Sequence, residues 1–192
     1  METELCKLAF KYGADKCPQI NHQYTPFYYD FLKDKRNSIK KILEFGVGDN
    51  KVKAVIPNYT IGASLYMWRD FFPNAQIYGA DIARECIFED ERIKTYRCNE
   101  FSKPQVEELI KTIGSDIDLV IDDADHHTNR QMDLLRYLMP LLQKSVTYII
   151  EDCGNTNLVA KNFPEYNSYI PTLIPDTRVK RRRERIIVLT NK

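Results

Sequence analysis

The chain lacks any long apolar run. Over its 192 residues, no stretch approaches the roughly 20 apolar residues that a membrane-spanning helix needs. The opening residues Met1-Glu-Thr-Glu4 have neither the basic nor the apolar region of a signal peptide. We therefore expect a protein that stays in the cytoplasm and has no membrane partner.

Two further absences narrow the class of protein. The five cysteines are an odd, scattered set without a C-x-x-C pair, which is typical of reduced thiols rather than of a disulfide framework or a zinc site. An excess of charge is also missing, because 28 basic residues against 27 acidic ones leave a formal net charge of +1. No overall field favours nucleic acid as a partner. The basic run over 180–185 is more simply a solvated turn.

The length and the order of the expected elements favour one α/β domain. At 43% hydrophobic content, 192 residues can bury one core but are too few for two ordinary domains. Short apolar runs alternate with helical patterns, in the β-α-β order of a mostly parallel, doubly wound sheet with helices on both faces. We divide the domain 1–192 into a helical N-terminal segment (1–38), a cofactor-binding core (39–152) and a short C-terminal region (153–192).

Capping and turn residues set the expected bounds of these elements. Thr3 caps a first helix that Gly13 ends, Thr25-Pro26 begins a second helix, and Pro104 and Gly114 bracket another. Further helices are expected over 63–72 and 129–138, and strands over 41–45, 76–80, 92–96, 117–121, 147–150 and 185–189. The stretch 49–61 is longer than an ordinary strand-to-helix loop and predicts a lid or a disordered segment.

Three acidic clusters, each at the end of an expected strand, give the strongest functional signal. They are Glu44-Phe-Gly-Val-Gly48, Asp118-Leu-Val-Ile-Asp122-Asp123-Ala-Asp-His126-His127 and Tyr148-Ile-Ile-Glu151-Asp152. Because the carboxyl ends of parallel strands meet at one edge of a sheet, where ligands bind, we expect the three clusters to converge on an active site.

The first cluster and the strand after it indicate an adenosine-containing cofactor. Gly46 and Gly48 would let the backbone approach a ligand closely, and Asp81 could accept hydrogen bonds from a ribose diol. Plain tight turns contain the same glycines. The third glycine of the dinucleotide fingerprint is missing, since Asp49-Asn-Lys51 follows Gly48, and this argues against NAD.

The second and third clusters indicate a hard divalent cation. Their carboxylates would repel one another unless a cation compensated them, and oxygen ligands fit Mg²⁺ or Mn²⁺ better than structural zinc. The five acids are Asp122, Asp123, Asp125, Glu151 and Asp152. Solvated acidic loops are the alternative explanation of this pattern.

A histidine beside the acids suggests a general base. His126 lies three residues after Asp123, and a histidine titrates in the range that a base needs near neutral pH, whereas His127 should point elsewhere. A structural histidine is the alternative. The polar loop that contains Asp15, Lys16 and His22 also carries side chains able to bind a ligand, although an ordinary solvated loop would look the same.

Taken in order, these motifs resemble the metal-dependent class I S-adenosylmethionine O-methyltransferases that modify the sugars of macrolide antibiotics. The resemblance covers roughly 8–152. It lies in the ordered set Tyr12-Gly-Ala-Asp15-Lys16, His22-x-Tyr24-Thr25-Pro26-x-Tyr28, Glu44-Phe-Gly-Val-Gly48, the run 62–81, Ile121-Asp-Asp123-x-x-His126 and Ile150-Glu151-Asp152.

This resemblance implies a Rossmann-like methyltransferase fold and a set of site residues. The cofactor would contact Glu44, Gly46 and Asp81, Mg²⁺ would be held by Asp123, Glu151 and Asp152, and His126 would be the catalytic base. We add Gly48, Asn99 and Asp122 to the expected cofactor contacts. At 98–100, where the family tends to have Gly-Asp-Gln, this chain has Cys-Asn-Glu.

The sequence therefore predicts an S-adenosylmethionine- and Mg²⁺-dependent O-methyltransferase for a hydroxyl of a small acceptor, with a sugar or glycoside favoured. A methyltransferase for a catechol or an amine is one alternative, and a non-catalytic nucleotide-binding or scaffold domain is another. The sequence leaves open the identity of the acceptor and whether the chain forms a homo-oligomer.

Overall fold

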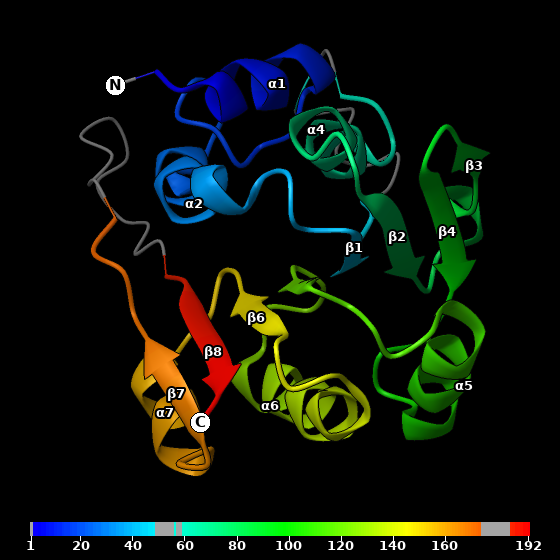
Figure 1. Cartoon of the computed structure of the whole chain (residues 1–192), viewed down its shortest axis with the longest axis vertical. Coiled ribbons are helices and arrows are strands. Elements are labelled where there is room, and N and C mark those ends of the chain that lie inside the picture. The colour runs from blue at the N-terminus through cyan, green and yellow to red at the C-terminus, as the bar shows by residue number, and fades with distance from the viewer. Residues whose placement is uncertain (1, 49–55, 57–58, 174–184) are drawn as a thin grey trace.

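The computed structural model describes residues 2–48, 56, 59–173 and 185–192, and these form one mixed sheet between two layers of helices (Figure 1). The strands are β1 (Lys41–Phe45), β2 (Gln76–Asp81), β3 (Glu89–Asp90), β4 (Ile93–Arg97), β5 (Leu119–Asp122), β6 (Thr147–Ile150), β7 (Tyr166–Tyr169) and β8 (Ile187–Asn191). The helices are α1 (Glu4–Tyr12), α2 (Tyr24–Leu32), α4 (Ala63–Phe71), α5 (Lys103–Ile113), α6 (Thr128–Leu138) and α7 (Thr156–Asn162), with 3₁₀ turns η1 (Lys33–Lys35), η2 (Arg84–Cys86) and η3 (Met139–Leu141).

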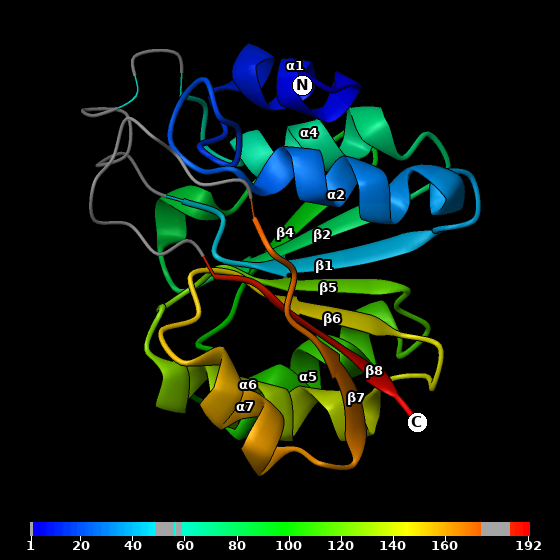
Figure 2. The same ribbon diagram turned by 90° about the vertical axis from the view of Figure 1, so that its left-hand side faces the viewer.

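The sheet has the order β3-β4-β2-β1-β5-β6-β8-β7. Strand β1 pairs in parallel with both β2 and β5, so the order of the strands reverses beside β1. At such a switch point the loops diverge and leave room for a ligand at the carboxyl ends. These ends lie toward the left in Figure 2, next to the loop that joins α1 to α2.

The alternation of side chains along each strand builds two separate cores. On β1, Ile42 packs with the layer of α1, α2 and α4, while Leu43 packs with the layer of α5, α6 and α7. Ile149 and Ile150 on β6 divide in the same way. Both faces of the parallel strands are therefore buried, which explains why these strands read as continuous apolar runs.

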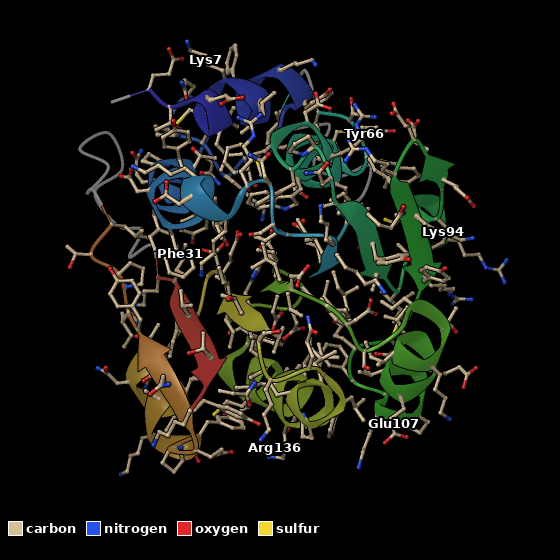
Figure 3. The ribbon with its side chains drawn as sticks, in the orientation of Figure 1. Lys7, Phe31, Tyr66, Lys94, Glu107 and Arg136 are labelled. Carbon is tan, nitrogen blue, oxygen red and sulfur yellow. The ribbon has the colours of Figure 1, made fainter. Side chains whose placement is uncertain are left out.

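Helices α1, α2 and α4 cover one face of the sheet, and α5, α6 and α7 cover the other (Figure 2). Lys7 of α1, Glu107 of α5 and Arg136 of α6 point away from the sheet in Figure 3. Helix α1 begins where expected, because the Thr3 side chain accepts a hydrogen bond from the backbone N–H of Cys6, and it ends at Gly13 in the left-handed conformation. The expected fold class is confirmed.

Several bounds differ from the sequence prediction for physical reasons. Helix α2 starts at Tyr24, so Thr25 lies inside the helix, buried with its hydroxyl 3.1 Å from the sulfur of Cys6, instead of capping it. Helix α7 and strand β7 were not predicted. Three of the four residues of β7 are exposed, so this edge strand carries no apolar pattern. Strand β8 runs antiparallel to β6 and starts at Ile187.

The lid or disordered segment expected over 49–61 and the solvated turn expected over 180–185 fall largely outside the described residues. Within the described part of the chain, no helix combines the length and the apolar character needed to cross a membrane.

Candidate active site

A cavity of about 620 Å³ lies at the carboxyl ends of the strands. Its volume is in the range of about 300–1,000 Å³ that is usual for small-molecule sites. The loops after β1, β2, β5 and β6 line it, together with the loop between α1 and α2. The three acidic clusters of the sequence therefore contribute to one cavity, as their positions at strand ends predicted.

Asp81 forms a fixed anionic point on one wall of the cavity. Its Oδ2 accepts a hydrogen bond from the backbone N–H of Val47 at 2.8 Å, and its Oδ1 accepts one from the backbone N–H of Ala83 at 2.9 Å. Each carboxylate oxygen has a second lone pair. The loops after β1 and β2 thus hold the carboxylate in place while it can still accept hydrogen bonds from a ligand.

The fold requires a glycine at position 46 even without a ligand. Its φ is +89°, and a Cβ built there would lie 2.2 Å from the backbone oxygen of Asp123. The missing side chain therefore lets the end of β1 and the turn after β5 approach each other. We expected the glycine to admit a ligand, but the first contact that a side chain would make is with the acidic turn.

Asp123, His126 and Asp152 bring one ligand-type atom each within 4.8 Å of one another. The Nδ1 of His126 lies 4.0 Å from the Oδ1 of Asp123. His126 has φ +61° and Asp152 has φ +46°, a backbone region that residues other than glycine rarely adopt. Such strain is typical of functional turns, because the surrounding structure must hold it.

The two adjacent histidines point to different places. His126 lines the cavity with its side chain about half exposed. The Nδ1 of His127 lies 2.7 Å from the Oδ1 of Asp125, and the His127 side chain is 78% exposed. The cavity-facing histidine is thus the one that the sequence prediction selected as the base.

Lys16 is buried among the acids. Its Nζ donates hydrogen bonds to the Oδ2 of Asp123 at 2.6 Å and to the Oε2 of Glu151 at 2.7 Å, and it lies 3.3 Å from the Oε1 of Glu44. We expected a divalent metal to be the remedy for the repulsion among the acids at the strand ends. The chain's own ammonium group compensates Asp123 and Glu151 as well, so a metal would not be their only counter-charge.

Burial and this ammonium act in opposite directions on the pKa values. Burial alone would lower the pKa of Lys16, but the attraction of Asp123, Glu151 and Glu44 outweighs it and raises that pKa well above the ordinary value. Burial raises the pKa of the Glu151 carboxyl well above its usual range, and Lys16 opposes this shift. We infer that Lys16 is charged and that its ion pairs stabilise Asp123, Glu151 and Glu44 at the ends of the strands.

Two tyrosines of α2 complete the network. The hydroxyl of Tyr28 donates to the Oε1 of Glu151 at 2.6 Å, and the hydroxyl of Tyr24 donates to the Oδ1 of Asp152 at 2.7 Å. Together with Lys16, they occupy both oxygens of Glu151 and one oxygen of Asp152. The N-terminal segment therefore orients the acids of the strand ends.

Three expected cofactor residues, Glu44, Asn99 and Asp122, are not among the described residues that line the cavity. Glu44 is buried, and its Oε2 accepts a hydrogen bond from the indole N–H of Trp68 at 2.7 Å. Asp122 is buried too and accepts from the hydroxyl of Tyr148 at 3.3 Å, on the opposite face of the sheet from Glu44. Their contribution to binding stays a prediction, and for the two buried acids it would be indirect.

Sequence reasoning missed two kinds of site residue. Glu100 and Phe101 line the cavity directly after Asn99, one position beyond the expected contact. Lys16 was noted as part of a polar loop and of a resemblance motif, but no role was assigned to it. The signal that could have found it is the alternation along the strands, which places Glu44 and Glu151 on the face that the N-terminal helices cover.

The order of the strands and the helices on both faces of the sheet are those of the class I methyltransferase fold. The MycE methyltransferase from the mycinamycin biosynthetic pathway, solved in complex with Mg, SAH and mycinamycin VI, superposes with a TM-score of 0.76 at 24% identity, over 99% of this chain and 55% of that one. At this level of identity, the likeness shows the fold alone. No family model matches the chain.

Curated relatives show which methyltransferases the chain is related to. It is 32% identical over 149 residues to the mycinamicin VI 2''-O-methyltransferase of Micromonospora griseorubida. It is 30% identical over 149 residues to an 8-demethyl-8-(2-methoxy-alpha-L-rhamnosyl)-tetracenomycin-C 3'-O-methyltransferase of Streptomyces olivaceus. Each alignment covers 78% of this chain and 36% of the relative, so the chain spans about a third of their length. Both relatives are O-methyltransferases, the class that the motifs of this chain resemble.

Gly46→Ala should destabilise the protein more than Gly114→Ala. Both glycines have φ +89°, which residues with a side chain rarely adopt, so each alanine is strained on this ground alone. At Gly46 the new Cβ would also meet a backbone oxygen, whereas at Gly114 the nearest atom is the movable carboxylate of Asp116 at 2.7 Å. Urea unfolding of both variants measures the difference. Equal losses would show that the close approach to Asp123 is not a constraint.

Asp122→Asn should flatten the dependence of stability on pH. Burial is the main cause that raises the pKa of Asp122 from its ordinary 3.8 to about 7. Because the folded state holds this proton more tightly than the unfolded chain, the free energy of unfolding should fall as pH rises from about 4 to 7, by at most about 1.4 kcal/mol per pH unit. Urea unfolding from pH 5 to pH 8 should show a smaller decline in the variant.

The control for that experiment is Asp116→Asn. The pKa of Asp116 is lowered, chiefly by its hydrogen bond with Lys41, so this group stays ionised throughout the same pH range. Its variant should keep the wild-type slope. If Asp122→Asn keeps that slope as well, Asp122 does not titrate near neutral pH.

Proposed function

We propose that this chain is an S-adenosylmethionine- and Mg²⁺-dependent O-methyltransferase that acts on a hydroxyl of a small acceptor, favouring a sugar or glycoside. The observation that carries the proposal is one cavity with two chemically distinct walls. Asp81 offers a fixed carboxylate on one wall, and Asp123, His126 and Asp152 form a metal-type cluster with a histidine on another. The relatives named above support the same reaction class.

The residues on the first wall fit an adenosine cofactor. Asp81 lies at the end of β2, where a carboxylate can accept hydrogen bonds from the ribose diol, and its two backbone donors fix its position. Ile82 and Phe101 line the cavity nearby, are both partly exposed and offer apolar surface for a base. Gly48 lines the cavity with φ +85°.

The residues on the second wall fit Mg²⁺. Asp123 and Asp152 supply the hard oxygen donors that this ion prefers, and each is partly exposed to the cavity. Glu151 was expected as a third ligand and stays a prediction. Its oxygens already accept hydrogen bonds from Lys16 and Tyr28, so ligation by Glu151 would have to use their second lone pairs, beside the Lys16 ammonium.

In this proposal the residues divide the work of methyl transfer. Bound S-adenosylmethionine would supply an electrophilic methyl group, and bound Mg²⁺ would lower the pKa of a neighbouring acceptor hydroxyl. His126 lines the cavity beside Asp123, and its ring would accept the hydroxyl proton as the oxygen gains the methyl group. The walls of the cavity hold the two partners in line.

The proposed setting is the cytoplasm. All five cysteines are free and buried, which fits a reducing compartment. The proposed acceptors follow the relatives, whose names specify hydroxyls on mycinamicin VI and on rhamnosyl tetracenomycin C. We propose no nucleic-acid or membrane partner, and a homo-oligomer stays open.

Methyl transfer tests the proposal directly. The chain is incubated with S-adenosylmethionine and Mg²⁺ or EDTA, and products from a rhamnoside, a catechol and an amine are measured by mass spectrometry. Mg²⁺-dependent methylation of the rhamnoside is expected. Transfer only to catechol or amine would change the acceptor class, and cofactor binding without any transfer would favour a scaffold.

Asp81→Asn should weaken the binding of S-adenosylhomocysteine by about 10- to 100-fold, since a hydrogen bond to a charged group contributes about 1.5–3 kcal/mol. Glu85→Gln is the control, because Glu85 lines the same cavity on the neighbouring 3₁₀ turn η2. Calorimetry with the wild type and both variants measures the affinities. Heat of binding with NAD but none with S-adenosylhomocysteine would contradict the cofactor assignment.

His126→Ala should reduce turnover by about 10²- to 10⁴-fold, the usual contribution of a general base, with little change in cofactor affinity. The neighbouring variant His127→Ala is the control, because His127 contacts Asp125 and is not among the described residues that line the cavity. Turnover of the wild type and both variants is measured with the same concentrations of S-adenosylmethionine and Mg²⁺. If His127→Ala reduced turnover and His126→Ala did not, His126 would not be the general base.

A further inference from the structure

Lys16 places a full positive charge where water does not reach it. The residue is 1% exposed, and its ammonium contacts Asp123, Glu151 and Glu44 at 2.6, 2.7 and 3.3 Å. An ammonium donates hydrogen bonds and accepts none, and here it donates to Asp123 and Glu151 and forms an ion pair with Glu44. Three converging carboxylates are also the donor set that a divalent cation prefers.

The acidic site has a deep half and a shallow half. The side chains of Glu44 and Glu151 are 0% and 1% exposed, whereas those of Asp123 and Asp152 are 20% and 28% exposed. Asp123 joins the two halves, because its Oδ2 bonds to Lys16 and its Oδ1 lies on the side of His126. The deep acids thus face the lysine, and the shallow ones face the cavity.

We propose that Lys16 is a positioning residue that serves as a built-in cation for the deep half, so that the acidic site holds one exchangeable divalent ion, on its cavity side. The inference rests on the proposed function only where it assigns Mg²⁺ to Asp123 and Asp152. It has two consequences. The acidic site keeps its shape without metal, and removal of the ammonium opens the deep carboxylates to a second divalent ion.

The test measures Mn²⁺ binding to the full chain without any cofactor. Wild type and Lys16→Met are compared by calorimetry for the number of ions bound, and by thermal melting in EDTA and in Mn²⁺. Lys16→Met should bind one more Mn²⁺ per chain than the wild type. The rise in melting temperature from EDTA to Mn²⁺ should also be larger in the variant, because the ion replaces the missing charge.

Lys41→Met is the matched control. Lys41 pairs with Asp116 at the opposite end of β1, so the same substitution removes an ion pair away from the acidic site. This variant should bind the same number of Mn²⁺ ions as the wild type and respond to EDTA in the same way.

A second variant covers the case in which Lys16→Met does not fold in EDTA. The double substitution Lys16→Met with Glu151→Gln removes one charge of each sign, so it should fold without metal and bind as many Mn²⁺ ions as the wild type. Lys16→Met itself should then fold when Mn²⁺ is added. A Lys16→Met chain that stays unfolded in Mn²⁺ while the double variant folds would overturn the proposal, because Mn²⁺ would not be replacing the ammonium.

The outcomes separate this inference from the proposed function. Equal Mn²⁺ stoichiometry and equal EDTA sensitivity in the wild type and Lys16→Met would overturn the role of Lys16, whatever the wild type binds. Binding of one ion by Lys16→Met and of none by the wild type would support the role of Lys16. That second result would contradict the metal dependence of the proposed methyltransferase.

Discussion

The contact between the Lys16 ammonium and the carboxylates at the strand ends is the interaction on which the rest of the site depends. An unpaired charge inside a protein costs several kcal/mol, so neither partner can be buried without the other. The ends of the strands supply the carboxylates, and the loop between α1 and α2 supplies the ammonium group of Lys16. The N-terminal layer is therefore part of the active site as well as a cover for one face of the sheet.

The alternation of side chains along the strands decides which acids take part. Glu44 follows Ile42 on the face of α1, α2 and α4, and Glu151 follows Ile149 on the same face. Asp122 follows Val120 on the other face and meets Tyr148 in the second core. Adjacent acids such as Asp122 and Asp123 thus have different environments, one closed by packing and one open to the cavity.

Sequence patterns predicted the parts of this structure that local rules determine. Strands β1 and β6 have the expected bounds, because a short apolar run between turn residues is enough to specify a buried strand. The convergence of Asp123, His126 and Asp152 followed from their places after parallel strands. Lys16 could not be found in this way, since its partners lie 107 and 135 residues further along the chain. Strand β7 was missed because an exposed edge strand needs no apolar alternation.

These sequence separations also bear on the order in which the chain acquires its structure. Contacts between distant residues form slowly, because a long loop must close before the contact offsets the lost chain entropy. During synthesis, Lys16 leaves the ribosome well before Glu151, and α1 and α2 must wait for β6 before they can dock with their charges paired. The cavity should therefore be completed near the end of folding, when β6 brings Glu151 to the loop that has carried Lys16 from the start.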